Sequence, residues 1–232
     1  DLDPEFGGRR NTELTPANLE DVEGLMASGG LDIGLAVDGD GDRAGAVSLR
    51  RPAEADSARF FAGNEVATLL VYGTLKQAQA AAGDAWDPSQ YAIVRSIVST
   101  AWSDAVGRHF GLPEEHLIKT AVGFRFLNDA IREARDQGTQ VAAAFEENGG
   151  IALGTAIPYK DGFAADLKFM EVAAREKLAG RSVEGLVAEV EQAIPPPLFV
   201  RTDVMSSRDP STAGLFGPRG TVMQAFGRIA DD

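Results

Sequence analysis

The chain has 232 residues, of which 44% are hydrophobic and 25% charged, the composition of an ordinary soluble globular protein with a sizeable core. Its formal net charge of −13 argues against a nucleic-acid or anionic-membrane surface, because such surfaces need clustered Lys and Arg. No apolar run approaches the roughly 20 residues that a membrane helix requires. With no cysteine, the sequence excludes disulfides, thiolate nucleophiles and zinc–thiolate sites, and it fits a reducing, cytoplasmic setting.

The first part of the chain predicts a helix followed by two strands. Residues 1–16 are polar and do not begin with Met, so we interpret the chain as a piece of a longer protein. A helix is expected to follow, with an inward stripe of Leu19, Val22, Leu25 and Met26. Residues 31–37 and 44–49 predict two strands, the first of them buried, and residues 50–59 predict a polar turn.

The longer second part alternates helices and strands. Asn64 is expected to cap a helix that runs to about Ala82. The elements expected next are strand 91–98, helix 102–110, strand 116–119, a helix from 126, strand 140–145, a helix from 163 with Leu167, Met170, Ala174 and Leu178 inward, and a helix capped by Ser182. This order predicts one α/β domain. The segment before it offers too few strands to bury its own helix and is expected to be part of another domain.

The stretch between the first two strands reads Asp38-Gly39-Asp40-Gly41-Asp42-Arg43. Glycines allow a tight fold of the backbone, so the three carboxylates can converge on one point, where their repulsion calls for a cation. Hard oxygen ligands in this number suit Mg²⁺, and Arg43 can hold a phosphate beside it in a two-pronged grip.

Two other readings of this stretch compete with a metal site. Asp and Gly clusters are common in ordinary turns, because both residues tolerate unusual backbone angles. The Asp-x-Asp-x-Asp spacing also opens an EF-hand loop, which needs Gly at its sixth position and Glu at its twelfth. Here these positions hold Arg43 and Leu49, which excludes the EF-hand.

The sequence resembles the α-D-phosphohexomutases, the phosphoglucomutase and phosphomannomutase group, at five places in the family's order. The loop from Asp38 to Arg43 is similar to the family's Mg²⁺ loop. The other four places are Gly63-Asn64-Glu65, Val122-Gly123-Phe124-Arg125, Glu146-Glu147-Asn148-Gly149-Gly150 and Ile157-Pro158-Tyr159-Lys160-Asp161-Gly162. The resemblance implies α/β/α layered domains with a mixed sheet flanked by helices. It assigns 1–55 to the end of domain 2, 56–195 to domain 3, and 196–232 to a linker or the start of domain 4.

The resemblance also implies a reaction. In this family a phosphoserine of the first domain passes its phosphoryl group to a hexose phosphate, and the intermediate reorients and returns another. Asp38, Asp40 and Asp42 would bind Mg²⁺, and Arg43 would steady the phosphoryl group. Glu146 and Asn148 would hold the hydroxyls of a glucose or mannose phosphate, with Gly123 and Arg125 also at the substrate.

Two residues depart from the family's pattern. Asn148 replaces the usual serine and keeps its hydrogen bonding with more bulk. Arg125 replaces the usual lysine, and because arginine does not deprotonate in proteins we assign it phosphate or hydroxyl contact, not proton transfer.

The family's nucleophilic serine loop and its fourth-domain phosphate loop have no counterpart in this sequence. We therefore expect a fragment that lacks domains 1 and 4 and is inactive alone. The alternative is a non-catalytic paralogue that binds a sugar phosphate or a partner protein. A third reading, a phosphatase with an aspartate nucleophile, fits the later motifs poorly.

Overall fold

The fold is described from a computed structural model, and the described residues are 12–50, 57–154 and 158–197. All of them belong to one compact unit that ends at Pro197. The expected segments 1–11 and 198–232 lie outside the described residues, as do the turn residues 51–56 and Ile157.

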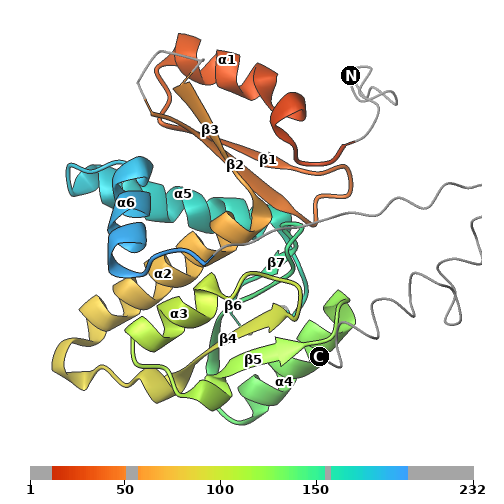
Figure 1. Cartoon of the computed structure of the whole chain (residues 1–232), viewed down its shortest axis with the longest axis vertical. Helices are drawn as coiled ribbons and strands as arrows, with labels where there is room; N and C mark the ends of the chain where they lie inside the picture. The colour runs from red at the N-terminus through yellow and green to blue at the C-terminus, as the bar shows by residue number, and fades with distance from the viewer. Residues whose placement is uncertain (1–11, 51–56, 155–157, 198–232) are drawn as a thin grey trace, which may run out of the picture. The chain divides into compact units, whose positions relative to one another are not determined.

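The first sheet is a three-stranded antiparallel meander. It consists of β1 (Ile33–Val37), β2 (Ala44–Leu49) and β3 (Ala58–Phe61), in that order, with Val37 opposite Ala44 at the hairpin end. A short 3₁₀ turn (Pro16–Asn18) and α1 (Glu20–Gly29) cover one face (Figure 1). Helix α1 lies so close to the strand that a Cβ on Gly34 would be 2.3 Å from Val22 Cγ1.

The second sheet is mixed and lies between helices. Its strand order is β5 (Leu117–Thr120), β4 (Tyr91–Ser96), β6 (Gln140–Phe145) and β7 (Ile151–Ala152), with β4 parallel to both neighbours and β7 antiparallel to β6. Helices α2 (Gly63–Ala82) and α3 (Trp102–His109) pack on one face and α4 (Phe124–Asp136) on the other (Figure 1). Three short 3₁₀ turns lie between these elements, at Gly83–Ala85, Pro88–Gln90 and Glu114–His116. The predicted α/β class with a mixed, helix-flanked sheet is confirmed.

Helix α5 (Gly162–Leu178) joins the two sheets into one core, and α6 (Val183–Ala193) closes it. The buried residues of α5 contact α2 and the inner face of the first sheet. The rings of Phe61 in β3 and Phe169 in α5 lie 5.9 Å apart. A Cβ on Gly73 of α2 would be 2.7 Å from Val172, so the two helices approach closely at this point. The core therefore runs without interruption from the first sheet to the second.

The predicted inward stripes were wrong for α5 and for one residue of α1. Leu167, Met170 and Leu178 are exposed by 64%, 47% and 89%, and Leu25 of α1 by 66%. The buried apolar side chains of α5 are instead those of Ala165, Phe169 and Val172. Both sets of positions follow a helical period, so periodicity did not distinguish the core face from the second apolar face.

Two strands and one cap also differ from the prediction. Strand β3 was not predicted and overlaps the last two residues of the expected polar turn 50–59, and the two-residue strand β7 was missed. The N-cap of α2 is Ala62, whose N–H donates to Glu65 Oε2 at 3.2 Å, so Asn64 is not the cap. Asn64 Oδ1 instead accepts the backbone N–H of Thr100 at 3.1 Å.

Gly63 is predicted to be intolerant of any side chain. A Cβ at this position would lie 2.2 Å from the backbone nitrogen of Gly149, where no flexible side chain can move aside. We expect Gly63→Ala to lower the free energy of unfolding by about 1–3 kcal/mol, measured by urea denaturation followed by circular dichroism. Gly24→Ala in α1, where nothing lies within 4 Å, is the matched control and should stabilise slightly. Equal stability of Gly63→Ala and wild type would contradict the close contact.

Asp166 of α5 predicts a pH dependence of stability. Burial raises the pKa of its carboxyl group from 3.8 to about 7, and its Oδ1 atom has no hydrogen-bond partner among the described residues. Between these values the folded protein holds a proton that the unfolded chain has released, so stability falls as the pH rises. As the pH rises from 3.8 to about 7, the free energy of unfolding of Asp166→Asn should increase relative to that of wild type. Asp129→Asn, on the exposed face of α4, should show no such relative increase.

Candidate functional site

The loop between β1 and β2 gathers three carboxylates. One ligand atom from each of Asp38, Asp40 and Asp42 can be chosen so that all lie within 4.8 Å of one another. Asp38 Oδ1 accepts the backbone N–H groups of Asp42 and Arg43, each at 3.1 Å, which folds the loop back on its first residue. Gly41 makes this possible with a φ of +74°. The structure thus brings the three predicted metal ligands together.

The electrostatics of the loop follow from crowding. Burial raises the pKa of Asp38, the N–H of Arg43 opposes this, and the charges of Asp40 and Asp42 add to the rise. A carboxylate surrounded in this way is stabilised by a nearby positive charge.

Two cations of the chain already contact the loop. Arg43 Nε lies 3.3 Å from Asp38 Oδ2, and Arg43 Nη1 is 2.6 Å from Glu13 Oε2. Lys160 Nζ lies 2.8 Å from Asp42 Oδ2. The other oxygen of Asp42, Oδ1, is buried and has no hydrogen-bond partner among the described residues. Three hard oxygen donors, one of them unsatisfied, fit a divalent cation such as Mg²⁺.

The predicted sugar-binding loop follows β6. The Glu146 side chain is 6% exposed, and its Oε1 accepts the backbone N–H of Gly123 at 3.1 Å. Asn148 Oδ1 accepts the N–H of Gly150 at 3.0 Å, which leaves its NH₂ group to donate. The structure therefore brings together Glu146, Asn148 and Gly123, which come from two different loops.

Arg125 lies in the first turn of α4, at the positive end of the helix dipole. Its side chain is exposed, and its guanidinium carbon lies 4.4 Å from the centre of the Phe126 ring. A cation is unfavourable for helix stability at this position. An arginine at a helix N-terminus is, however, a suitable place for an anion.

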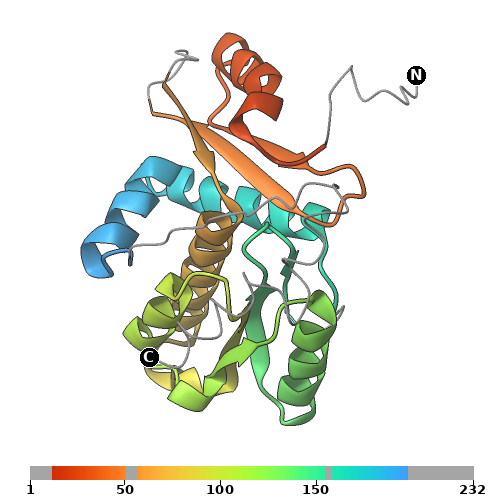
Figure 2. The same cartoon turned by 45° about the vertical axis from the view of Figure 1, so that its right-hand side comes forward.

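The loop of residues 38–43, called the metal loop below, and the loop of residues 146–150, called the sugar loop, are joined by backbone contacts. Ala44 N–H donates to Gly149 O at 3.0 Å, and Arg43 and Gly150 form an antiparallel bridge. The start of α5 joins them, since Gly162 N–H donates to Gly41 O at 3.0 Å. In Figure 2 one end of α5 lies beside the turn between β1 and β2. A Cβ on Gly149 would lie 2.8 Å from Ala44 O, and one on Gly162 2.4 Å from Arg43 O. The glycines of these motifs are therefore required by close approach.

Sequence reasoning missed two residues near these loops. Lys160 was quoted only as part of a motif, yet it contacts Asp42; the signal was a lysine just before the helix that reaches the loop. Arg95 is buried in β4 and makes two 2.8 Å hydrogen bonds to Asp104, while its Nη1 donates to the carbonyls of Ser96 and Ser99. A charged residue inside an apolar strand was the signal for this second case.

The comparisons with known proteins agree with this arrangement. A sequence model described as "Phosphoglucomutase/phosphomannomutase, alpha/beta/alpha domain III" matches residues 62–193, more than half of the chain. The chain belongs to the phosphoglucomutase/phosphomannomutase family. The predicted resemblance is therefore confirmed. Among the described residues of this family member, no helix is long and apolar enough to cross a membrane.

The relatives of this phosphohexomutase chain are much longer than it is. It is 29% identical over 180 residues to the glucose 1,6-bisphosphate synthase of Homo sapiens, covering 75% of this chain and 27% of that protein. The crystal structure of a phosphoglucomutase/phosphomannomutase family protein from Burkholderia thailandensis matches with a TM-score of 0.59 and 21% identity, covering 85% of this chain and 36% of that one. The chain thus spans about a quarter of that curated relative and about a third of that solved structure.

The metal loop predicts stabilisation by Mg²⁺. If the three carboxylates bind the ion, a roughly hundredfold excess over Kd stabilises the folded protein by about 2.7 kcal/mol, which raises its melting temperature. Asp40→Asn removes one exposed donor without breaking a described ion pair and should abolish most of this rise in differential scanning calorimetry. Asp84→Asn, an exposed aspartate of a 3₁₀ turn, should keep it. An undiminished rise in Asp40→Asn would refute the assignment.

Proposed function

We propose that this chain is the metal- and sugar-binding part of a phosphohexomutase that interconverts hexose 1-phosphate and hexose 6-phosphate. The observation that carries the proposal is the backbone junction of the metal loop with the sugar loop. It puts a cluster of three carboxylates beside a buried glutamate that can accept hydroxyl protons. Family membership supports a phosphoryl-transfer chemistry for this pairing.

The metal loop is proposed to act on the phosphoryl group. A bound Mg²⁺ held by Asp38, Asp40 and Asp42 would neutralise charge on that group. Arg43 is already oriented at the loop by its contacts with Asp38 and Glu13, so its guanidinium can hold a phosphoryl oxygen with little loss of conformational freedom. Lys160 supplies a second positive charge at Asp42 Oδ2.

The sugar loop is proposed to fix the hexose. Glu146 is held by Gly123, and its Oε2 lies near Gly150, at 3.5 Å from where a Cβ on that glycine would be. A carboxylate accepts two hydroxyl protons, and the NH₂ group of Asn148 can donate to a third oxygen. Arg125 and the N-terminus of α4 are proposed to bind the phosphate at the other end of the sugar.

The nucleophilic phosphoserine is proposed to lie in a part of the enzyme outside this chain. The described site contains acceptors and cations, and the coverage of about a quarter of the human relative leaves room for such a part. Incubated alone with glucose 1-phosphate, this chain should bind the sugar phosphate and form no glucose 6-phosphate. Turnover by the chain alone would overturn the proposal. If longer forms of the protein bind the sugar phosphate but none of them converts it, the non-catalytic paralogue is favoured.

Glu146→Gln is predicted to weaken sugar-phosphate binding. Glutamine keeps an acceptor for Gly123 N–H but loses the charge that strengthens hydrogen bonds from hydroxyls, which is worth roughly 10- to 100-fold in affinity. Isothermal titration with glucose 6-phosphate and with mannose 6-phosphate, both in Mg²⁺, measures the loss.

Glu115→Gln is the control for this prediction, because Glu115 is exposed in a 3₁₀ turn before β5. It should bind both sugar phosphates like wild type. Equal affinities of Glu146→Gln and wild type would remove Glu146 from the proposed sugar site.

A further inference from the structure

The central strand of the second sheet ends in a loop that the proposed function does not use. We define the β4 loop as residues 96–100, where β4 ends. The strand order β5-β4-β6 places the topological switch point of the sheet between β4 and β6, and in such sheets ligands bind beyond the carboxyl ends of the strands at this point. The sugar loop follows β6. The β4 loop is therefore its neighbour at the end of the sheet where a ligand is expected.

Two buried serines of the β4 loop contact the sugar loop and the residue before it. Ser99 N–H donates to Ser96 O at 3.0 Å, which closes a turn, and the two hydroxyl oxygens lie 2.7 Å apart. Ser96 Oγ donates to Glu147 Oε2 and Ser99 Oγ to the carbonyl of Phe145, both at 3.4 Å. Because these two partners are the residues on either side of Glu146, a shift of the β4 loop would disturb Glu146.

The other end of the β4 loop is joined to the sugar loop through α2. Thr100 N–H donates to Asn64 Oδ1 at 3.1 Å. Asn64 follows Gly63, which packs so closely against Gly149 that a Cβ on Gly63 would lie 2.2 Å from the Gly149 nitrogen. The β4 loop, the start of α2 and the sugar loop therefore form one continuous set of contacts.

Arg95 holds the β4 loop from inside the protein. It is 5% exposed, and its Nε and Nη2 atoms each donate to one carboxylate oxygen of Asp104 in α3, at 2.8 Å. Its Nη1 atom donates to Ser96 O at 3.2 Å and to Ser99 O at 3.0 Å. Because the guanidinium is planar and rigid, these bonds fix the orientation of the turn relative to α3. They also occupy the guanidinium, so Arg95 acts through the β4 loop and not by contact with a ligand.

Stability alone is a weak explanation for this buried ion pair. Taking two charges out of water costs desolvation energy, and apolar side chains of similar size often replace such a pair without loss of stability. A buried polar network in which the donors and acceptors are satisfied instead makes its surroundings rigid. The pair of Arg95 and Asp104 is thus suited to holding the β4 loop in one conformation.

We propose that Arg95 is a positioning residue of the sugar site. Held by Asp104, it keeps the β4 loop against the sugar loop, so that Glu146 and Asn148 are oriented before a hexose phosphate binds. This role rests on the proposed function, in which these two side chains hold the sugar. A site that is ordered in advance binds more tightly, because less of the interaction energy is lost in ordering its loops.

Hydrogen exchange followed by NMR measures the positioning without a ligand. Gly123 N–H donates to Glu146 Oε1, and Gly150 N–H donates to Asn148 Oδ1. Exchange of these two reporter amides therefore follows how firmly the two sugar-binding side chains are held.

Two variants test the role of Arg95. Arg95→Met/Asp104→Leu replaces the pair by apolar side chains and should stay folded. Arg95→Lys keeps a charge beside Asp104 but loses the planar fork. In both variants the reporter amides should exchange roughly tenfold faster than in wild type, because the sugar loop opens more often. Arg108→Lys, in an exposed ion pair of α3 with Glu114, is the control and should leave their exchange unchanged.

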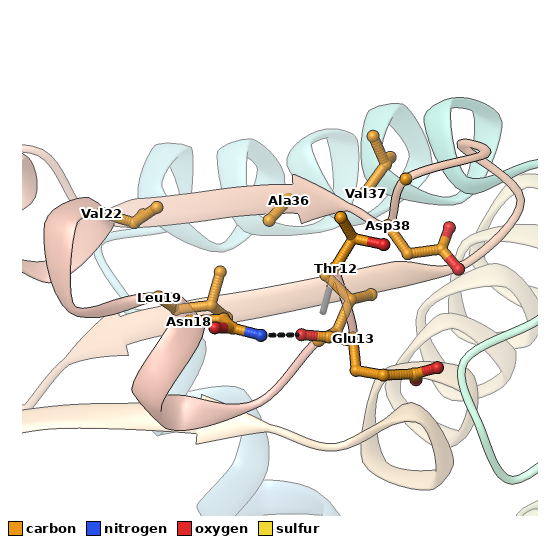
Figure 3. A pocket seen from close by; sticks show the side chains of 10 residues that line it. Thr12, Glu13, Asn18, Leu19, Val22, Ala36, Val37 and Asp38 are labelled. Carbon is orange, nitrogen blue, oxygen red and sulfur yellow. Dashed lines mark hydrogen bonds between the residues drawn. The ribbon is translucent and has the colours of Figure 1, made fainter. Parts of the chain in front are cut away.

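The metal loop is the internal control for general damage to the fold. The amides of Asp42 and Arg43 both donate to Asp38 Oδ1. Asp38 lies next to Thr12 at a cavity of about 370 Å³ that is lined by residues between 12 and 39 (Figure 3). Exchange of the Asp42 and Arg43 amides should be the same in both variants as in wild type. Equal acceleration of these amides and the reporter amides would show that Arg95 only supports the fold, and would overturn the proposal.

Isothermal titration with glucose 6-phosphate in Mg²⁺ separates this role from the proposed function. Both Arg95 variants should bind roughly tenfold more weakly than wild type, since the sugar loop must then be ordered on binding. If wild type binds and the variants bind equally well, or if the reporter amides exchange as in wild type, only the positioning role is refuted. If wild type itself binds no sugar phosphate, the proposed function is refuted and this role with it.

Discussion

The hydrogen bond from Ala44 N–H to Gly149 O joins two loops that lie about a hundred residues apart in the chain, and it is possible only because no side chain separates them. Gly63 packs closely against the backbone of Gly149, and the N–H of Gly162 at the start of α5 donates a hydrogen bond to Gly41 O. The separation between the three aspartates and Glu146 is therefore set by backbone contacts. Backbone contacts hold a geometry more tightly than long side chains, which lose rotamer freedom when they are fixed.

Charge is distributed unevenly around this junction. The chain has a net charge of −13, yet Arg43 and Lys160 both lie at the carboxylate loop and Arg125 lies at the start of α4. The local arrangement offsets the overall charge at this place, because nearby charges act more strongly on an anionic group than distant charges, which salt screens. The buried pair of Arg95 and Asp104 has another role: it fixes the carbonyls of Ser96 and Ser99 at the end of β4, beside the sugar loop.

Much of the fold could be predicted from local patterns. The bounds of β2 and β6 match the prediction, because each is a run of small or apolar residues between clear turns. The buried face of α5 could not be predicted, since its two apolar faces have the same period and only the sheet above it decides between them. The contact of Glu146 with Gly123 joins the loops after β5 and β6, two strands that have β4 between them, and residue spacing does not encode such a contact. The family is confirmed, while the domain boundaries and the roles of the site residues stay predictions.

The glycine contacts also separate two kinds of sequence change during evolution. Replacing Gly63, Gly149 or Gly162 would push the two loops apart and disturb the carboxylates together with the sugar loop. Replacing the side chain of Asn148 or Arg125 leaves those contacts intact. A lineage can therefore change such side chains while the arrangement of the three carboxylates and Glu146 is inherited unchanged.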